Sequence, residues 1–168
     1  MKKFVLVCVL MAALISLAGC AAFGSGSGLQ SGSTASPTAT GSTVACANGE
    51  ADYTTANTKN TLGGVCAKVV ISGHNITLTA TDVTHLTVAG DDNTVNAAVL
   101  SDATIVGTSN VVKTTTVGPL TVNGNSNIFT ALGPIGDVDV TGANDTITTP
   151  GTIGKVTQSG IGNKIGAP

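Results

Sequence analysis

Carboxylates are the first side chains of this chain that could do chemistry, and Asp91, Asp92 and Asp102 come closest to a cluster. A pair of carboxylates can hydrolyse a glycosidic bond, one acting as an acid and the other as a base or nucleophile. The spacing, however, puts Asp91 and Asp92 in one turn and Asp102 at a different place in the next repeat, so we interpret them as solvated turn residues. Calcium held between turns stays open as a minor role. We predict no catalytic residue and no defined metal site.

The two histidines do not suggest a site either. His74 follows a glycine by one residue and His85 precedes the next glycine by five, so we do not expect them to stack or to share a metal. No serine stands in a recognisable triad context, and a nucleophile elbow needs a strand-to-helix turn that the pattern below does not supply. We therefore expect no cofactor and no enzymatic activity.

The elements that position these residues are set by a repeat. Six glycines recur at almost constant spacing along the chain: Gly73, Gly90, Gly107, Gly124, Gly142 and Gly160. The last two intervals are one position longer than the first three. Apolar residues occupy fixed places around them, four and two before each glycine, five after it, and seven before the next, with Gln158 before the last glycine as the exception. A short fixed period of this kind is typical of a solenoid, in which one unit stacks on copies of itself.

The places four and two before each glycine predict a short strand, because a spacing of two sends both side chains to one side. Val69 and Ile71 are the first such pair, and threonines stand between most of the later pairs. The other two apolar columns predict two further walls, so three walls close each coil. The extra residue of the longer repeats falls in a loop near Gly133 and Pro150.

The segment after each glycine predicts a corner between two walls. Asparagine stands three residues after four of the glycines, as Asn93, Asn110, Asn127 and Asn163, and Asp145 takes that place once. Glycine and asparagine tolerate positive φ, and asparagine forms side-chain bonds to nearby backbone. We interpret these glycines and asparagines as repeat corners and expect an asparagine ladder along the axis.

The sequence therefore predicts an all-β fold, a single-stranded β-solenoid (β-helix) of about six coils of 17–18 residues. A β-sandwich would also alternate apolar and polar residues, but nothing in it would keep matching turns at one fixed spacing. The pattern leaves the handedness undetermined.

The start of the chain follows a different pattern, with Lys2 and Lys3 before an apolar run from Phe4 to Leu17. This run is shorter than the roughly 20 apolar residues that span a bilayer as a helix, and it is typical of a signal peptide. Leu17-Ala18-Gly19-Cys20 resembles the lipobox of bacterial lipoproteins, which implies that Cys20 becomes the lipidated first residue. A plain secretory signal is the alternative.

We thus expect three regions in this chain. Residues 1–19 form a lipoprotein signal peptide, residues 20–43 comprise the lipidated Cys20 and a flexible tether, and residues 44–168 form the solenoid. The tether is assigned from its Gly, Ser, Ala and Thr composition and its lack of charge. The protein is expected to be exported and lipid-anchored to the cell membrane or outer membrane of a bacterium.

Two cysteines remain beyond Cys20 in an exported chain, where oxidising conditions favour disulfides. Cys66 stands seven residues before Gly73, in an inward column, and Cys46 precedes it by one coil plus a small insertion. Residues one coil apart lie about 4.8 Å from each other, within reach of a disulfide. We predict that a Cys46–Cys66 disulfide staples an irregular N-terminal coil onto the stack.

Charge limits the partners. Beyond Cys20 the chain has five lysines, no arginine and nine acidic residues, so we expect no nucleic acid. The expected partners are the membrane, through the lipid on Cys20, and an envelope protein. We expect a monomer, with an end-to-end dimer as the alternative, because Lys155, Lys164 and Pro168 are the kinds of residue that protect a sheet edge.

The lipobox, the tether, the cysteine pair and the V-x-G-x-x-N-x-V coils together resemble an uncharacterised family of bacterial, notably actinobacterial and mycobacterial, secreted proteins and lipoproteins with a domain of unknown function. The resemblance covers residues 44–168 and implies no catalytic residues. We expect a non-enzymatic structural or protein-interaction module. The alternative is a protein that binds or cleaves envelope glycans. Smooth walls would favour the first function, and a groove lined by acids and aromatic residues would favour the second.

Overall fold

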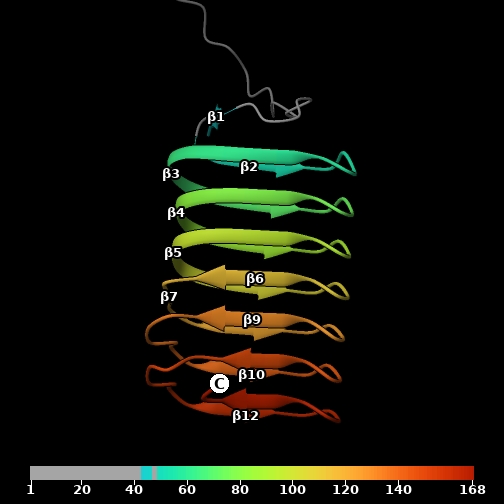
Figure 1. Cartoon of the computed structure of the whole chain (residues 1–168), viewed down its shortest axis with the longest axis vertical. Helices are drawn as coiled ribbons and strands as arrows, with labels where there is room; N and C mark the ends of the chain where they lie inside the picture. Colours follow the sequence, from blue (N-terminus) through green and yellow to red (C-terminus); the bar gives the residue numbers. More distant parts are fainter. Residues whose placement is uncertain (1–42, 47–48) are drawn as a thin grey trace, which may run out of the picture. The chain divides into compact units, whose positions relative to one another are not determined.

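The chain winds into a β-solenoid whose strands all pair in parallel (Figure 1). The computed structural model describes residues 43–46 and 49–168. These contain no helix, and hence none that could cross a membrane. The predicted all-β solenoid is confirmed. The strands are β1 (Thr43–Ala45), β2 (Glu50–Tyr53), β3 (Lys59–Ile71), β4 (Thr77–Val88), β5 (Thr94–Ile105), β6 (Val111–Thr114), β7 (Thr116–Val117), β8 (Leu120–Val122), β9 (Ile128–Ala131), β10 (Val138–Val140), β11 (Thr146–Thr148), β12 (Val156–Gln158) and β13 (Lys164–Gly166).

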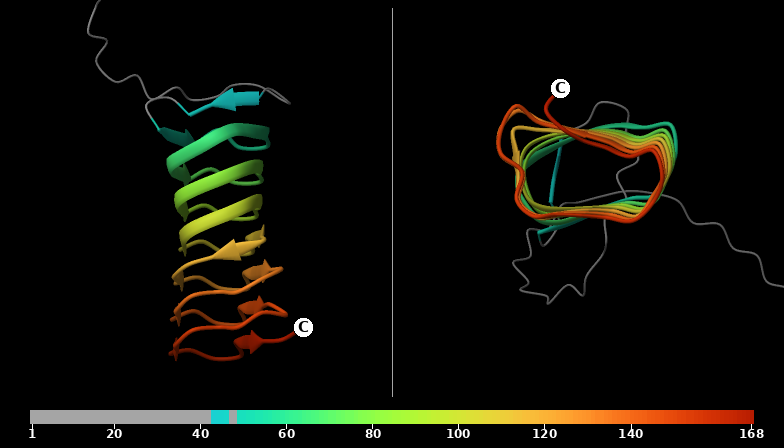
Figure 2. Two further views of the ribbon diagram at one scale, coloured as in Figure 1. Left: turned by 90° about the vertical axis from the view of Figure 1, so that its left-hand side faces the viewer. Right: turned by 90° about the horizontal axis from the view of Figure 1, so that it is seen from below.

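Each coil pairs with the next at a register equal to the repeat. Leu78 pairs with Val95 and Val95 with Val112, which is the shorter repeat. Phe129 pairs with Ile147, which is the longer one. The strands β3, β4 and β5 are long enough to bend around one side of the coil and join two walls. In the later coils the same path is divided among shorter strands (Figure 1). Viewed along its axis, the solenoid is a flattened ring with two long sides (Figure 2).

The solenoid has about seven coils, one more than the six glycines indicate. Strand β2 pairs with Lys68–Ile71, and the start of β3 pairs with the start of β4, so residues 50–66 form a coil in register with the others. Thr55 stands where later coils have glycine, which hides this coil from a glycine count. Its Tyr53 and Leu62 are buried in the inward columns. The predicted N-terminal coil is therefore present, and its irregularity is the register shift between Leu62 and Val65.

The extra residue of the longer coils lies where the sequence predicts it. Ala131 pairs with Thr114 at the shorter repeat, whereas Ile135 pairs with Val117 at the longer one, so the insertion falls within residues 132–134. The register between β3 and β4 shifts in the corresponding place, between Leu62 and Val65. Near one corner the later coils leave the outline that the earlier ones share (Figure 2). The insertions thus change the outer surface and leave the inward columns in phase.

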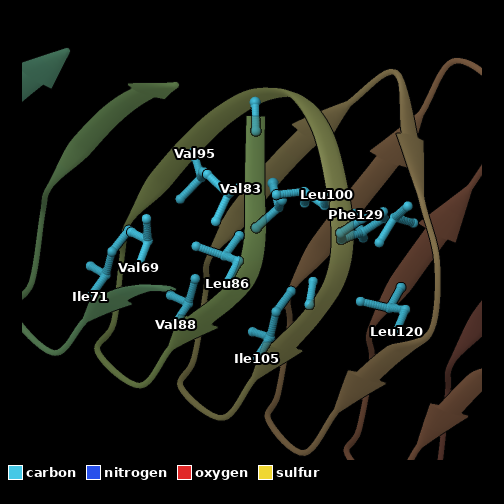
Figure 3. Packing of buried hydrophobic residues seen from close by; sticks show 14 of the residues in the cluster. Val69, Ile71, Val83, Leu86, Val88, Val95, Leu100, Ile105, Leu120 and Phe129 are labelled. Carbon is cyan, nitrogen blue, oxygen red and sulfur yellow. The ribbon is translucent and has the colours of Figure 1, made fainter. Parts of the chain in front are cut away.

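The core is a narrow column of aliphatic side chains from successive coils (Figure 3). From the second coil to the sixth, the four predicted apolar columns are buried except at Ile153, which is partly buried. Phe129, the one aromatic residue in the later coils, is 1% exposed. In the last coil the column opens to solvent, and Val156 is 45% exposed, because no further coil of the described chain covers it.

The corners differ from the prediction in one respect. The left-handed conformation belongs to the residue two after the glycine, at φ between 54° and 60° in Asn75, Asp92, Ser109, Ser126 and Asn144. The asparagines three after the glycine are not in this region, and of the six repeat glycines only Gly160 has a positive φ. The glycines are needed for another reason: a Cβ on Gly107 would overlap the carbonyl oxygen of Gly90 in the coil before.

Candidate functional site

The asparagines at the corners form a buried ladder along the axis. The side-chain oxygens of Asn93, Asn110 and Asn127 each accept a hydrogen bond from the backbone N–H in the preceding coil, at 2.9 Å. Their side-chain Nδ2 atoms donate to the carbonyl oxygens of Gly73, Gly90 and Gly107 at 2.9–3.0 Å. This ladder holds the coils in register, since buried polar groups need partners. It is inside the protein, so we assign it a structural role.

Asp145 interrupts the ladder while keeping half of its bonds. Its Oδ1 accepts hydrogen bonds from the backbone N–H of Asn127, at 2.8 Å, and from the Nδ2 of Asn127, at 3.0 Å. Its Oδ2 is buried without a partner, where an asparagine would donate to Gly124. Sequence reasoning placed Asp145 in the ladder but could not show which of its oxygens would be left without a donor.

The predicted disulfide between Cys46 and Cys66 is present, with a Cα–Cα distance of 5.7 Å. Cys66 is fully buried in its inward column, and Cys46 packs against the core beside it. The pair joins the segment before β2 to the coil of β3. Cys20, the proposed lipidation site, lies outside the described residues, as do residues 1–19 and all but the last residue of the expected tether.

Two outer walls of the solenoid present rows of outward side chains, and these walls differ in charge. We call one of these surfaces the lysine wall. It consists of the outward residues of β6, β9, β11 and β13 and the outward residues among the first four of β3, β4 and β5. It carries Lys59, Lys113 and Lys164 and no carboxylate among the described residues.

The opposite wall is rich in carboxylates. We call this surface the acid wall. It consists of the outward residues of β2, β8, β10 and β12, the residue just before β8, β10 and β12, and the outward residues among the last four of β3, β4 and β5. It carries Glu50, Asp52, Asp102, Asp137 and Asp139 beside Lys68 and Lys155.

The candidate acids of the sequence do not meet. Asp91 lies in a corner, where its carboxylate accepts a hydrogen bond from the backbone N–H of Thr108 at 2.7 Å, and Asp92 takes the left-handed position beside it. Asp102 lies on the acid wall, at the register position of His85 in the coil before. The three acids therefore form no pair of the kind that glycoside hydrolysis requires.

Sequence reasoning missed the contact between His85 and Asp102. His85 Nδ1 lies 2.5 Å from Asp102 Oδ2, and the side chains are 61% and 38% exposed. The signal was in the sequence, because both residues stand five before a glycine and hence one above the other. His74 lies in a corner, away from this column. Within the residues that the structure describes, no group of three or more metal-binding side chains occurs.

The lysine wall is hollowed by a groove of about 340 Å³. Outward side chains of four successive coils line it, and the nearby Leu132 is 70% exposed. Leu132 lies just before the extra residue and still has the shorter register, since its N–H donates to the carbonyl oxygen of Thr114 in the preceding coil. A volume of this size lies at the lower end of the range of ligand pockets. The groove is lined by the polar residues Thr79, Asn96, Lys113 and Thr130 and by the apolar residues Ala98 and Leu132, among others.

The groove fits neither of the two expected surfaces, a smooth wall or a groove lined by acids and aromatic residues. The wall is not smooth, yet the groove contains no acid and no aromatic residue among the residues that line it. Its donors and acceptors are threonine hydroxyls, the amide of Asn96 and the ammonium group of Lys113. Such a lining can hold a chain by hydrogen bonds and one charge, but it offers no pair of groups to transfer a proton.

A family model described as Protein of unknown function (DUF3060) matches residues 54–99. Neither the curated proteins nor the solved structures contain a match to this chain. The matched segment contains β3, β4 and part of β5, the regular coils with the longest strands. Residues 54–99 are therefore similar to the DUF3060 domain, carried here on a β-solenoid.

Proposed function

We propose that this protein is a non-enzymatic interaction module of the bacterial envelope, anchored by a lipid on Cys20, which binds a partner protein on its lysine wall. The observation that carries the proposal is the groove around Lys113. It is the site where a rigid wall exposes apolar and charged side chains together, and protein interfaces combine the same two elements. The repeat supplies the rigidity, because every coil is bonded to its neighbours.

Contact chemistry in the groove supports a protein partner. Leu132 and Ala98 are exposed apolar side chains, and Lys113 lies on the wall between them without a carboxylate on that wall to pair with. Large exposed apolar side chains beside polar groups are typical of interaction surfaces. A partner that covers Leu132 would gain about 1–2 kcal/mol from that side chain alone.

The groove proposal is tested by site-specific photo-crosslinking in cells. A photo-reactive residue in place of Ala98 is expected to form covalent adducts with a protein partner, whereas the same residue in place of Thr108, at the asparagine corner, is not. Leu132→Asp should reduce the adducts from position 98, and Ile161→Asp is the matched control, because Ile161 is an exposed apolar residue outside the groove. Equal labelling from both positions, or none, contradicts the proposal.

The anchor is tested separately. Cys20→Ala is expected to move the protein from the membrane fraction to the soluble exported fraction, since a lipidated cysteine holds a protein at a bilayer through its buried acyl chains. Mass spectrometry of the mature N-terminus should show the added acyl mass on Cys20. A variant that still fractionates with membranes would overturn the anchor and leave the groove proposal untouched.

A glycan is the second candidate ligand, because Thr79, Asn96, Lys113 and Thr130 present hydrogen-bonding groups in one line along the axis. Fragments of envelope glycans would then shift the NMR signals of these residues. The absence of such shifts, together with protein adducts from position 98, would leave the protein partner as the ligand.

A further inference from the structure

We infer that the partner of the lysine wall is the acid wall of a second copy of this chain, so that copies pack side by side with parallel axes. The contact we identify is a ridge on the acid wall entering the groove of the next copy. The ridge consists of Lys68, His85, Asp102 and Pro119, which succeed one another in a single outward column. This inference rests on the proposed function in that it names the partner of the same groove.

The cross-section of the solenoid makes this packing geometrically simple. The two walls lie on the opposite long sides of a flattened ring (Figure 2). A copy shifted sideways without rotation therefore brings its acid wall against the lysine wall of its neighbour. The interface joins two different surfaces of the same chain, so it leaves a free surface on each copy and continues into an array.

The same shift brings the ridge to the groove. The groove column, which contains Thr79, Asn96 and Lys113, comes just before the chain turns the short side of the ring. The ridge column comes just after that turn, at His85 and Asp102. Both columns thus lie beside the same short side, and in shifted copies they face each other.

Asp102 lies after Asn96 and before Lys113 along the winding chain, and Asn96 and Lys113 pair in adjacent coils. A shift along the axis of less than one coil spacing therefore brings Lys113 opposite Asp102 of the second copy. Thr130 and the adjoining Leu132 face Pro119, an exposed apolar ring. The amide of Asn96 faces the imidazole of His85. The central contact is therefore an ion pair flanked by a polar and an apolar contact.

Charge favours contact between a lysine wall and an acid wall over contact between two like walls. The lysine wall carries three lysines and no acid among the described residues, and the acid wall carries five acids and two lysines. Two lysine walls, or two acid walls, would repel each other, whereas unlike walls attract. In the first coil Lys59 faces Asp52 of the second copy, which repeats the sign of the Lys113–Asp102 contact. In the last coil Lys164 faces the uncharged Thr157.

The size of the contact predicts a weak association. Seven coils at about 4.8 Å and strands of about 13 Å give a wall of roughly 450 Å² per copy, or about 900 Å² in total. Interfaces below about 1,200 Å² are typical of transient complexes. Chains anchored at the same end to one membrane would be concentrated there and already share a parallel orientation.

The test is sedimentation velocity of the purified full-length protein at low salt over a range of concentrations. We expect dimers and larger species that dissociate at about 0.5 M NaCl, since salt screens exposed charges. Lys113→Glu and Asp102→Lys should each weaken self-association at least tenfold when alone. An equimolar mixture of the two variants should recover it, because contacts between the two variants again join opposite charges. Lys155→Glu, on the acid wall in the last coil and beyond the ridge, is the matched control and should associate no more weakly than the unchanged protein.

Carbodiimide cross-linking adds a direct readout. Lys113 and Asp102 of one chain lie on opposite walls, so a peptide that joins them reports a contact between two copies. A chain that stays monomeric at every concentration, or whose association Lys113→Glu leaves unchanged, overturns the inference. Protein adducts from position 98 that contain a different protein would then leave the proposed function standing with another partner.

Discussion

Asp145 accepts two hydrogen bonds from Asn127 through one carboxylate oxygen and leaves its other oxygen buried without a partner. Asp145 occupies a rung of a ladder that is otherwise built of asparagines, and it is 1% exposed. A buried polar atom without a hydrogen bond destabilises the folded state. The ladder therefore contains one weak rung, which leads to the first prediction.

Asp145→Asn is expected to stabilise the protein by about 1 kcal/mol, because the new Nδ2 donates to the carbonyl oxygen of Gly124 as the other asparagines do to their glycines. Urea unfolding at neutral pH measures the change. Asn127→Asp should destabilise the protein by more than this, because the new oxygen would lie against the Gly107 carbonyl oxygen and the Asp145 carboxylate, to both of which the Nδ2 of Asn127 now donates. A loss of stability in Asp145→Asn would show that the ladder is held differently.

Gly107→Ala is expected to destabilise the protein by more than about 3 kcal/mol or to prevent folding. Its Cβ would overlap the carbonyl oxygen of Gly90, and the overlap could be relieved only by separating two hydrogen-bonded coils. Gly133→Ala is the control, since a Cβ there would meet Thr115 at 3.1 Å and its loop faces solvent. Equal melting temperatures for the two variants would argue against a close stack at the glycines.

Removal of the disulfide should loosen the first coil more than the rest. Replacing Cys46 and Cys66 by alanine removes a closed loop of 20 residues, which the chain-entropy model equates to about 3 kcal/mol. Because each coil contacts only its neighbours, we expect faster hydrogen exchange in β2 and little change in β5. Uniformly faster exchange along the solenoid would mean instead that the coils unfold as one unit.

The burial of Tyr53 leads us to expect that the stability of the folded protein depends on pH under alkaline conditions. Burial raises the pKa of the Tyr53 hydroxyl above its usual value of 10.0. The unfolded chain then loses this proton at a lower pH than the folded chain. The contribution of Tyr53 to stability is full below about pH 10 and is lost as the pH rises through the raised pKa.

Absorbance of the phenolate checks this directly, because Tyr53 is the only tyrosine and the chain has no tryptophan. We expect the folded protein to titrate above pH 10 and the unfolded protein near it. Tyr53→Phe should be less sensitive to alkali than the unchanged protein, and it should lose no stability at pH 8, since the hydroxyl has no hydrogen-bond partner. A folded-state titration at the usual pH would contradict the prediction.

The fold could be predicted from the sequence because stacking in a solenoid repeats one local pattern. The places of Val69, Leu78 and Val83 relative to their glycines already determine which side chains face inward, and the spacing of Cys46 and Cys66 predicts their disulfide. The first coil could be predicted from the cysteine spacing alone, because Thr55 replaces the marker glycine there. The left-handed corner residue was misplaced by one or more positions because φ follows the exact path of the turn, which residue type alone does not specify.

What the tertiary structure decided is how residues of neighbouring coils and opposite walls lie in space. The sequence by itself contained His85 and Asp102 at equal places in their repeats, but only the register of the coils brings their side chains to 2.5 Å. It likewise contained Lys113 and Leu132, yet only the stacking of successive coils places their side chains along one groove. The inward or outward position of a residue follows from its place in the repeat, whereas a site depends on side chains that several coils place side by side.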